Sequence, residues 1–127
     1  MAFRDSLSVK DDIEAEINRE ARAVSINLLT GLVRVTPVDT GRARGNWFVG
    51  VRAPNRGNDP TRNARTAISQ GSSVIGTVKS ISYPTIVLSN NLPYIERLNE
   101  GYSDQAPAKF VEKEIDRVAN ARRLNGG

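Results

Sequence analysis

The chain has 127 residues, 39% of them hydrophobic and 25% charged, with a net charge of +4. These values fit one globular domain, and no apolar run is long enough to span a bilayer. The absence of cysteine excludes disulfides and thiol chemistry, and the absence of histidine removes the commonest metal ligand and general base. The amino terminus lacks the layout of a signal peptide. We therefore expect a protein made and used in a cytoplasm, or in a particle assembled there.

The positive charge is concentrated in the middle of the chain. Residues 1–36 and 81–127 are nearly balanced, whereas residues 37–80 carry seven basic and two acidic side chains. The seven are Arg42, Arg44, Arg52, Arg56, Arg62, Arg65 and Lys79. The guanidinium fork of arginine suits carboxylates and phosphates, so this segment is a candidate contact surface.

A long helix is predicted over residues 7–36. Ser8 and Asp11 have the spacing of a helix-capping pair, and more carboxylates follow in the opening turns. One apolar stripe recurs at steps of three and four through Ile13, Ile17, Ala21, Val24, Leu28, Leu32 and Val35. At 1.5 Å per residue the helix is about 40 Å long, more than so small a domain readily covers. Two alternatives stay open: the stripe meets another chain, or helices from the carboxyl-terminal half cover it.

A helix-to-strand corner follows. Pro37 disfavours helical geometry at Thr36 and should end the helix. Asp39 can cap the turn that comes next, through Thr40, while Gly41 and Gly45 are expected to supply backbone freedom. The local pattern alone is that of a well-made corner.

The rest of the chain predicts a small sheet and shorter helices. Residues 46–52 alternate as a half-buried strand, with Trp47, Val49 and Val51 on one face. Residues 53–63 form a long polar loop that should be mobile in the isolated chain, and a helix is predicted over 62–78. The β-branched segment 85–89 is expected to pair with the first strand.

The carboxyl-terminal segment predicts two helices. Pro93 suits the first turn of a short helix over 94–99, and Gly101 is expected to end it in the left-handed conformation. A last helix over 107–124 should bury one face, and residues 125–127 should fray. The predicted buried face comprises Phe110, Val111, Ile115 and Val118. The fold class is therefore α+β: a single domain over residues 1–127, in which a long amino-terminal helix packs on a small antiparallel sheet.

No combination of residues makes a convincing catalytic site, so we expect a protein that is not an enzyme and binds no cofactor or metal. The carboxylates from Glu96 to Asp116 lie mostly at the spacing of solvated helix faces. The arginine-rich middle has three interpretations: an ordinary basic surface, a contact with nucleic acid, or a contact with acidic surface on another subunit. The opening turns of the first helix are themselves acidic, which suits a head-to-tail contact.

Two segments together resemble a known family. Residues 36–47 read Thr-Pro-Val-Asp-Thr-Gly-Arg-Ala-Arg-Gly-Asn-Trp, and residues 89–107 read Ser-Asn-Asn-Leu-Pro-Tyr-Ile-Glu-Arg-Leu-Asn-Glu-Gly-Tyr-Ser-Asp-Gln-Ala-Pro. Their order and separation resemble those of the neck and tail-completion proteins of tailed bacteriophages, the Z-like minor-tail group. Asn99 departs from that pattern, which often has a carboxylate there, and Lys109-Phe110 replaces a common Gly-Met.

The resemblance implies a structural virion protein at the head–tail junction, assembled in the host cytoplasm. It implies a ring, hexameric by tail symmetry, around the DNA channel between a head-closure or connector protein and a tail-terminator protein. DNA would be contacted through its backbone charge. The residues expected to contact subunits or the channel are Arg42, Arg44, Trp47, Arg52, Arg56, Arg62, Arg65, Tyr94 and Tyr102. For Trp47 a core position is the favoured alternative. The residues of the shared structural motif are Pro37, Asp39, Thr40, Gly41, Asn90, Pro93, Gly101, Ser103, Ala106 and Pro107.

Two other functions stay open. One is a small basic protein that binds nucleic acid without sequence preference, through residues 42–65. The other is a tail-terminator subunit, which would share the same partners.

Overall fold

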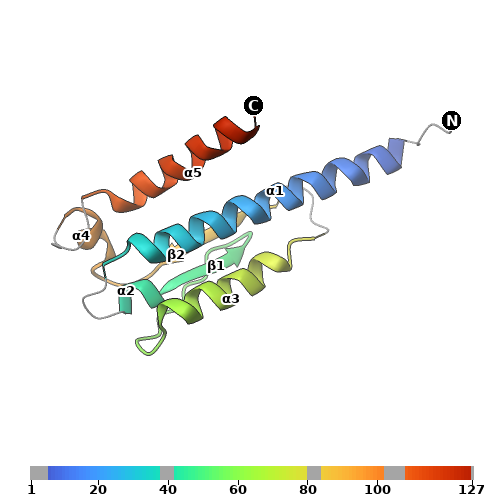
Figure 1. The fold of residues 1–127 in the computed structure, drawn as a ribbon. Coiled ribbons are helices and arrows are strands. Elements are labelled where there is room, and N and C mark those ends of the chain that lie inside the picture. Colours follow the sequence, from blue (N-terminus) through green and yellow to red (C-terminus); the bar gives the residue numbers. More distant parts are fainter. Residues whose placement is uncertain (1–5, 38–41, 80–83, 102–107, 127) are drawn as a thin grey trace.

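The computed structural model describes residues 6–37, 42–79, 84–101 and 108–126. The elements in chain order are α1 (Ser6–Val35), α2 (Arg42–Gly45), β1 (Trp47–Val51), α3 (Ala64–Gly76), β2 (Ile86–Asn90), α4 (Ile95–Asn99) and α5 (Phe110–Gly126). Figure 1 shows the predicted α+β architecture, in which the long first helix is the central element. The fold class is confirmed.

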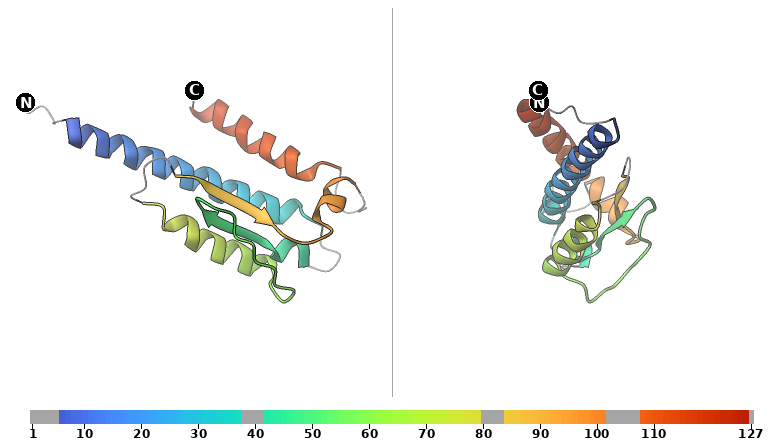
Figure 2. Two further views of the ribbon diagram at one scale, coloured as in Figure 1. Left: turned by 180° about the vertical axis from the view of Figure 1, so that it is seen from behind. Right: turned by 90° about the vertical axis from the view of Figure 1, so that its right-hand side faces the viewer.

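The sheet lies on one side of α1 and α5 lies on the other. Among the described residues it has two strands, and β1 runs antiparallel to β2 with Trp47 opposite Asn90 and Val51 opposite Ile86. This is the predicted pairing. Helix α3 packs against both α1 and β1, whereas α5 packs along α1 (Figures 1 and 2). The core that joins these elements comprises Leu29, Leu32, Val33, Trp47, Val49, Ala67 and Ile75.

The two halves of α1 differ in what covers them. Its carboxyl-terminal half is buried, with Leu29 fully covered and Leu32 2% exposed. Its first turns extend beyond the ends of α3 and α5 (Figures 1 and 2). There Ile13 is 54% and Ile17 37% exposed. Of the two alternatives for the apolar stripe, cover by other helices therefore holds only for its second half.

Helix α3 begins two residues later than predicted because Asn63 caps it. The Asn63 side chain accepts hydrogen bonds from the backbone N–H and the hydroxyl of Thr66, at 2.9 and 3.0 Å. This satisfies one of the free amide groups at the start of a helix. On the side that faces the core, Ala67 and Ile75 are fully buried.

Helix α5 buries a different face from the one predicted. Phe110, Glu114 and Val118 face α1 and are buried, whereas Ile115 is 45% exposed. The reason lies on α1: Gly31 has no side chain, and a Cβ there would lie 1.9 Å from Oε1 of Glu114. The carboxylate fills that space, so the predicted burial of Ile115 is wrong.

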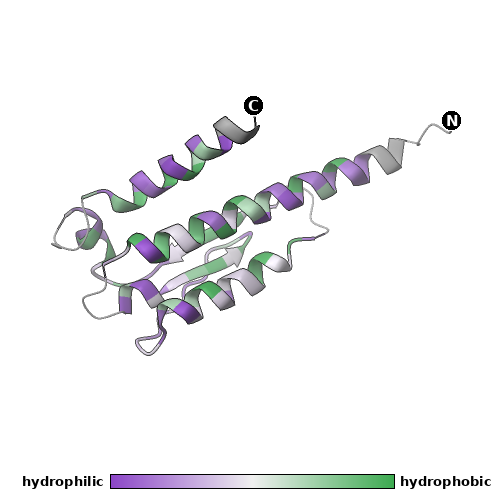
Figure 3. Cartoon of the chain, viewed as in Figure 1, coloured by the Kyte–Doolittle hydropathy of each residue, from purple (hydrophilic) through white to green (hydrophobic). Residues whose placement is uncertain are grey.

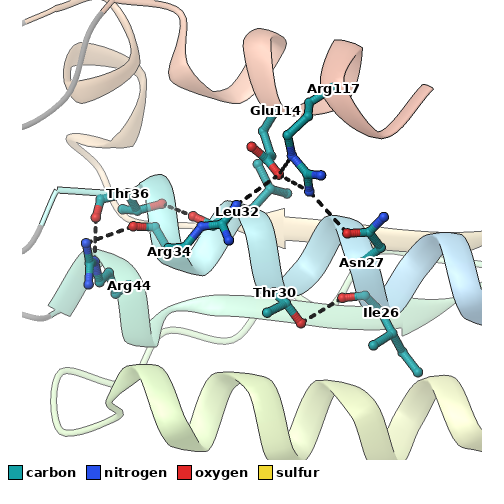
Figure 4. A network of polar contacts seen from close by, with 9 residues as sticks. All are labelled: Ile26, Asn27, Thr30, Leu32, Arg34, Thr36, Arg44, Glu114 and Arg117. Atoms are coloured by element: carbon teal, nitrogen blue, oxygen red, sulfur yellow. Dashed lines mark hydrogen bonds and ion pairs between the residues drawn. The ribbon is translucent and has the colours of Figure 1, made fainter. Parts of the chain in front are cut away.

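Figure 4 shows how the buried Glu114 is neutralised. Its Oε1 accepts from Nε of Arg117 at 2.7 Å, and the same guanidinium donates to Asn27 on α1 at 3.1 Å. Bonding to Glu114 raises the pKa of Arg117. The contact between α1 and α5 is therefore part apolar and part ionic.

Candidate assembly surfaces

The corner between α1 and β1 is held by a buried threonine. Thr36 is fully covered, and its hydroxyl donates to the Leu32 carbonyl at 2.6 Å. The same hydroxyl oxygen accepts from the indole N–H of Trp47 at 2.9 Å. Trp47 is 5% exposed. This burial supports the alternative that Trp47 is a core residue and argues against its predicted role in a subunit contact.

Arg44 closes the carboxyl-terminal end of α1. Its Nε donates to the Thr36 carbonyl at 2.6 Å and its Nη2 to the Arg34 carbonyl at 2.8 Å (Figure 4). The last carbonyls of a helix lack partners within the helix, and a cation there also complements the helix dipole. Arg44 therefore stabilises the fold, whatever else its half-buried side chain contacts.

The loop between β1 and α3 is pinned to the rest of the domain. The Asn46 amide group donates to the carbonyls of Arg42 and Asp59 and accepts from the Asp59 N–H, all within 2.9 Å. The Asn91 side chain donates to the carbonyl of Asn55 at 2.9 Å. These bonds argue against the mobility predicted for residues 53–63.

Asp59 shapes the end of this loop. Its Oδ1 accepts from both the N–H and the hydroxyl of Thr61, at 2.9 and 2.7 Å. These two hydrogen bonds, helped by the nearby charge of Arg62, hold the pKa of the exposed Asp59 carboxyl below its ordinary value. The exposed carboxylate thus supports a turn at the surface.

Arg62 lies inside the molecule, which argues against its predicted contact with a subunit or a DNA channel. It is 7% exposed and donates to the carbonyls of Gly45 and Trp47, at 3.1 and 2.6 Å. Its guanidinium lies 3.8 Å from the centre of the Phe48 ring. Burial lowers the pKa of this arginine. The loop returns Arg62 to β1, where it donates to the Trp47 carbonyl, and no local sequence pattern predicts this.

Position 45 has to be glycine because the fold leaves no room there for a side chain. Its φ is not positive, so the backbone freedom expected of it is not used. A Cβ on Gly45 would lie 1.8 Å from the carbonyl oxygen of Arg62. The start of α3 therefore reaches α2 only because this position lacks a side chain.

The remaining predicted contact residues are nearer the surface. Arg52, Arg56 and Arg65 are exposed. Arg42 is half-buried and donates to the Asn58 side chain at 3.3 Å. Tyr94 is half-buried, directly before α4. Tyr102 lies outside the described residues.

Two of the predicted structural-motif residues, Asn90 and Gly101, have visible roles in the fold. The Asn90 side chain donates to the Ala43 carbonyl at 2.9 Å, which ties β2 to α2. Gly101 has a φ of +102°, so the predicted left-handed end of α4 is confirmed. Pro37 is buried and Pro93 exposed. The other motif residues lie outside the described part of the chain: Asp39, Thr40, Gly41, Ser103, Ala106 and Pro107.

Asn99, where the sequence differs from the pattern that it resembles, links α4 to α5. Its Oδ1 accepts from the N–H of Val111 at 2.9 Å, and its Nδ2 donates to the Glu112 carboxylate at 2.9 Å. A carboxylate at this position would repel Glu112. An amide is therefore the side chain that satisfies both partners.

A groove runs along one side of α1, next to its first turns. The groove, of about 370 Å³, is lined by Ile17, Ala21 and Val24 with Glu20 and Arg122. The last two residues form an ion pair between α1 and α5. Figure 3 shows hydrophobic and hydrophilic residues alternating along these turns. The groove continues between the two helices toward Val118.

Within the described ranges, no three His, Cys, Asp or Glu side chains are grouped as a metal ion would need. The helices that the structure describes include none with the length and apolar character needed to cross a membrane. Comparison of the chain with protein-family models, curated proteins and solved structures finds no match in any of the three.

Proposed function

We propose that this chain is a structural subunit of the head–tail junction of a tailed bacteriophage. It self-associates into a ring around the DNA channel and joins the head connector to the tail terminator. The resemblance of residues 36–47 and 89–107 to neck and tail-completion proteins is the starting point. In this proposal the protein makes and breaks no covalent bond.

The observation that supports an assembly role is the uncovered stripe on α1. Ile13 and Ile17 leave apolar surface in water on turns that extend past the domain, which is costly for a protein that stays alone. Contiguous apolar surface of this kind is typical of contacts with other proteins. A subunit that is covered by its neighbours in a ring would bury it.

The experiment is electron microscopy of particles made without this protein. The proposal predicts filled heads and separate tails, and restored joining when the wild-type gene is supplied in trans. Normal joining in the absence of the protein would reject the proposal.

Nucleic-acid binding is the second candidate, supported by the exposure of Arg52, Arg56 and Arg65. The case for nucleic-acid binding is weaker because Arg44 and Arg62 donate to carbonyls of the chain itself. It predicts binding of bare duplex DNA by the monomer, with a steep loss as salt rises. Negligible binding at physiological salt would reject it.

A further inference from the structure

We propose that the first turns of α1 dock on the opposite end of a second copy of this chain, where α2 meets the start of α3. This inference rests on the proposed self-assembly and names the two surfaces that make the contact. We call residues 10–17 the acidic arm. We call the two exposed arginines Arg34 and Arg65 the arginine end.

The acidic arm combines apolar anchors with negative charge. Ile13 and Ile17 are partly exposed on one side of the helix. Four carboxylates accompany a single lysine: Asp11, Asp12, Glu14 and Glu16 against Lys10. Lys10 lies 3.8 Å from Glu14, and Arg19, just beyond the arm, pairs with Glu16. With these two cations counted, the four carboxylates still leave the segment an excess of negative charge. A partner for this surface therefore needs positive charge around an apolar contact.

The arginine end supplies positive charge at a suitable place. The Arg34 side chain is 67% exposed, and the Glu114 carboxylate near it, at 4.0 Å, is already bonded to Arg117. Arg65 is exposed in the first turn of α3, where the positive end of the helix dipole adds to its charge. Asp59 is the acidic residue of the adjoining loop; its Oδ1 accepts from Thr61, and its charge is offset in part by the nearby Arg62.

The two surfaces lie at opposite ends of the molecule (Figure 1). Helix α2 and the start of α3 lie beside the carboxyl-terminal end of α1, and the acidic arm is the other end of the same helix (Figures 1 and 2). A contact between unlike ends is heterologous, and it propagates from copy to copy until the rotation closes a ring. A two-fold contact between two acidic arms would instead oppose like charges.

Two variants separate these arrangements. The arm variant carries Ile13→Ser and Ile17→Ser, and the end variant carries Arg34→Gln and Arg65→Glu. All four side chains are partly or largely exposed, so the fold should survive, which a thermal melt checks. The matched control is Ile26→Ser, because Ile26 is 40% exposed and lies nine residues from Ile17, on the opposite face of α1.

The test is sedimentation of the purified chain over a range of concentrations, at low and high salt. The inference predicts that the wild type and the control associate, more weakly as salt rises. Each variant alone should lose about tenfold or more in association constant. An equal mixture of the two should form a dimer and nothing larger, because the intact arm of one fits the intact end of the other.

Three results would overturn the inference. One is an end variant that associates as well as the wild type, since that indicates a contact between arms. The second is a mixture that stays monomeric, and the third is a wild type that stays monomeric at every concentration. A monomeric wild type together with unjoined heads and tails in its absence would reject this contact and leave the proposed function standing.

Discussion

The corner at Thr36 and the acidic arm lie at the two ends of the same helix and differ in how their side chains are used. At the corner, Thr36, Arg44 and Trp47 are bonded to groups of their own chain. At the arm, Ile13 and Ile17 leave apolar surface uncovered. The comparison teaches that a conspicuous motif can serve folding, while a plain amphipathic stripe carries the surface that is open to partners.

The largest effect is expected from Trp47→Ala in the corner. Removing a buried aromatic side chain typically costs about 3–5 kcal/mol of unfolding free energy, and here the Thr36 hydroxyl also loses the indole N–H. Urea unfolding followed by circular dichroism measures the loss. A change below about 1 kcal/mol would mean that this tryptophan is not part of the core.

Gly45→Ala comes next, because its new methyl group would meet the backbone carbonyl of Arg62. Overpacking of this kind costs about 1–3 kcal/mol. Gly76→Ala is the matched control, since a Cβ there meets nothing within 4 Å. Equal stabilities of the two variants in the same urea titration would show that α2 and α3 are not in close contact.

A smaller, pH-dependent effect is expected from Asp59→Asn. The Asp59 pKa is lower in the folded chain, so its contribution to stability is present above the pKa of the unfolded state. The contribution is lost as pH falls through the folded pKa. The variant should therefore be less stable than the wild type at neutral pH and equal to it in strong acid. A difference that persists in strong acid would assign the effect to something other than the charge.

The smallest effect on folding is expected at the arm. Ile13→Ser combined with Ile17→Ser should change the unfolding free energy of the monomer by no more than about 0.5 kcal/mol, as is usual for surface positions. Urea unfolding at a protein concentration too low for self-association measures the unfolding free energy of the monomer alone. A loss comparable to that of Trp47→Ala would mean that the arm is covered within its own chain.

Local patterns predicted three features: apolar periodicity predicted α1, alternation and β-branched residues predicted the antiparallel pairing of β1 with β2, and a helix-ending glycine predicted the left-handed Gly101. These depend on neighbouring residues or on one alternating pattern. The outcome for Arg62 could not be predicted, since it looks like the other arginines of residues 37–80 until the loop carries it under β1. Glu114 is similar: a carboxylate is placed on the buried face of α5 because Gly31, far away in the sequence, leaves room for it.

Thiol labelling tests the central claim most directly, because the chain has no cysteine of its own. A single cysteine is introduced as Ile17→Cys on the acidic arm or as Ile26→Cys on the opposite face of α1. As protein concentration rises, the account predicts that labelling slows at position 17 and stays unchanged at position 26. Equal labelling rates at position 17 at all concentrations would contradict it.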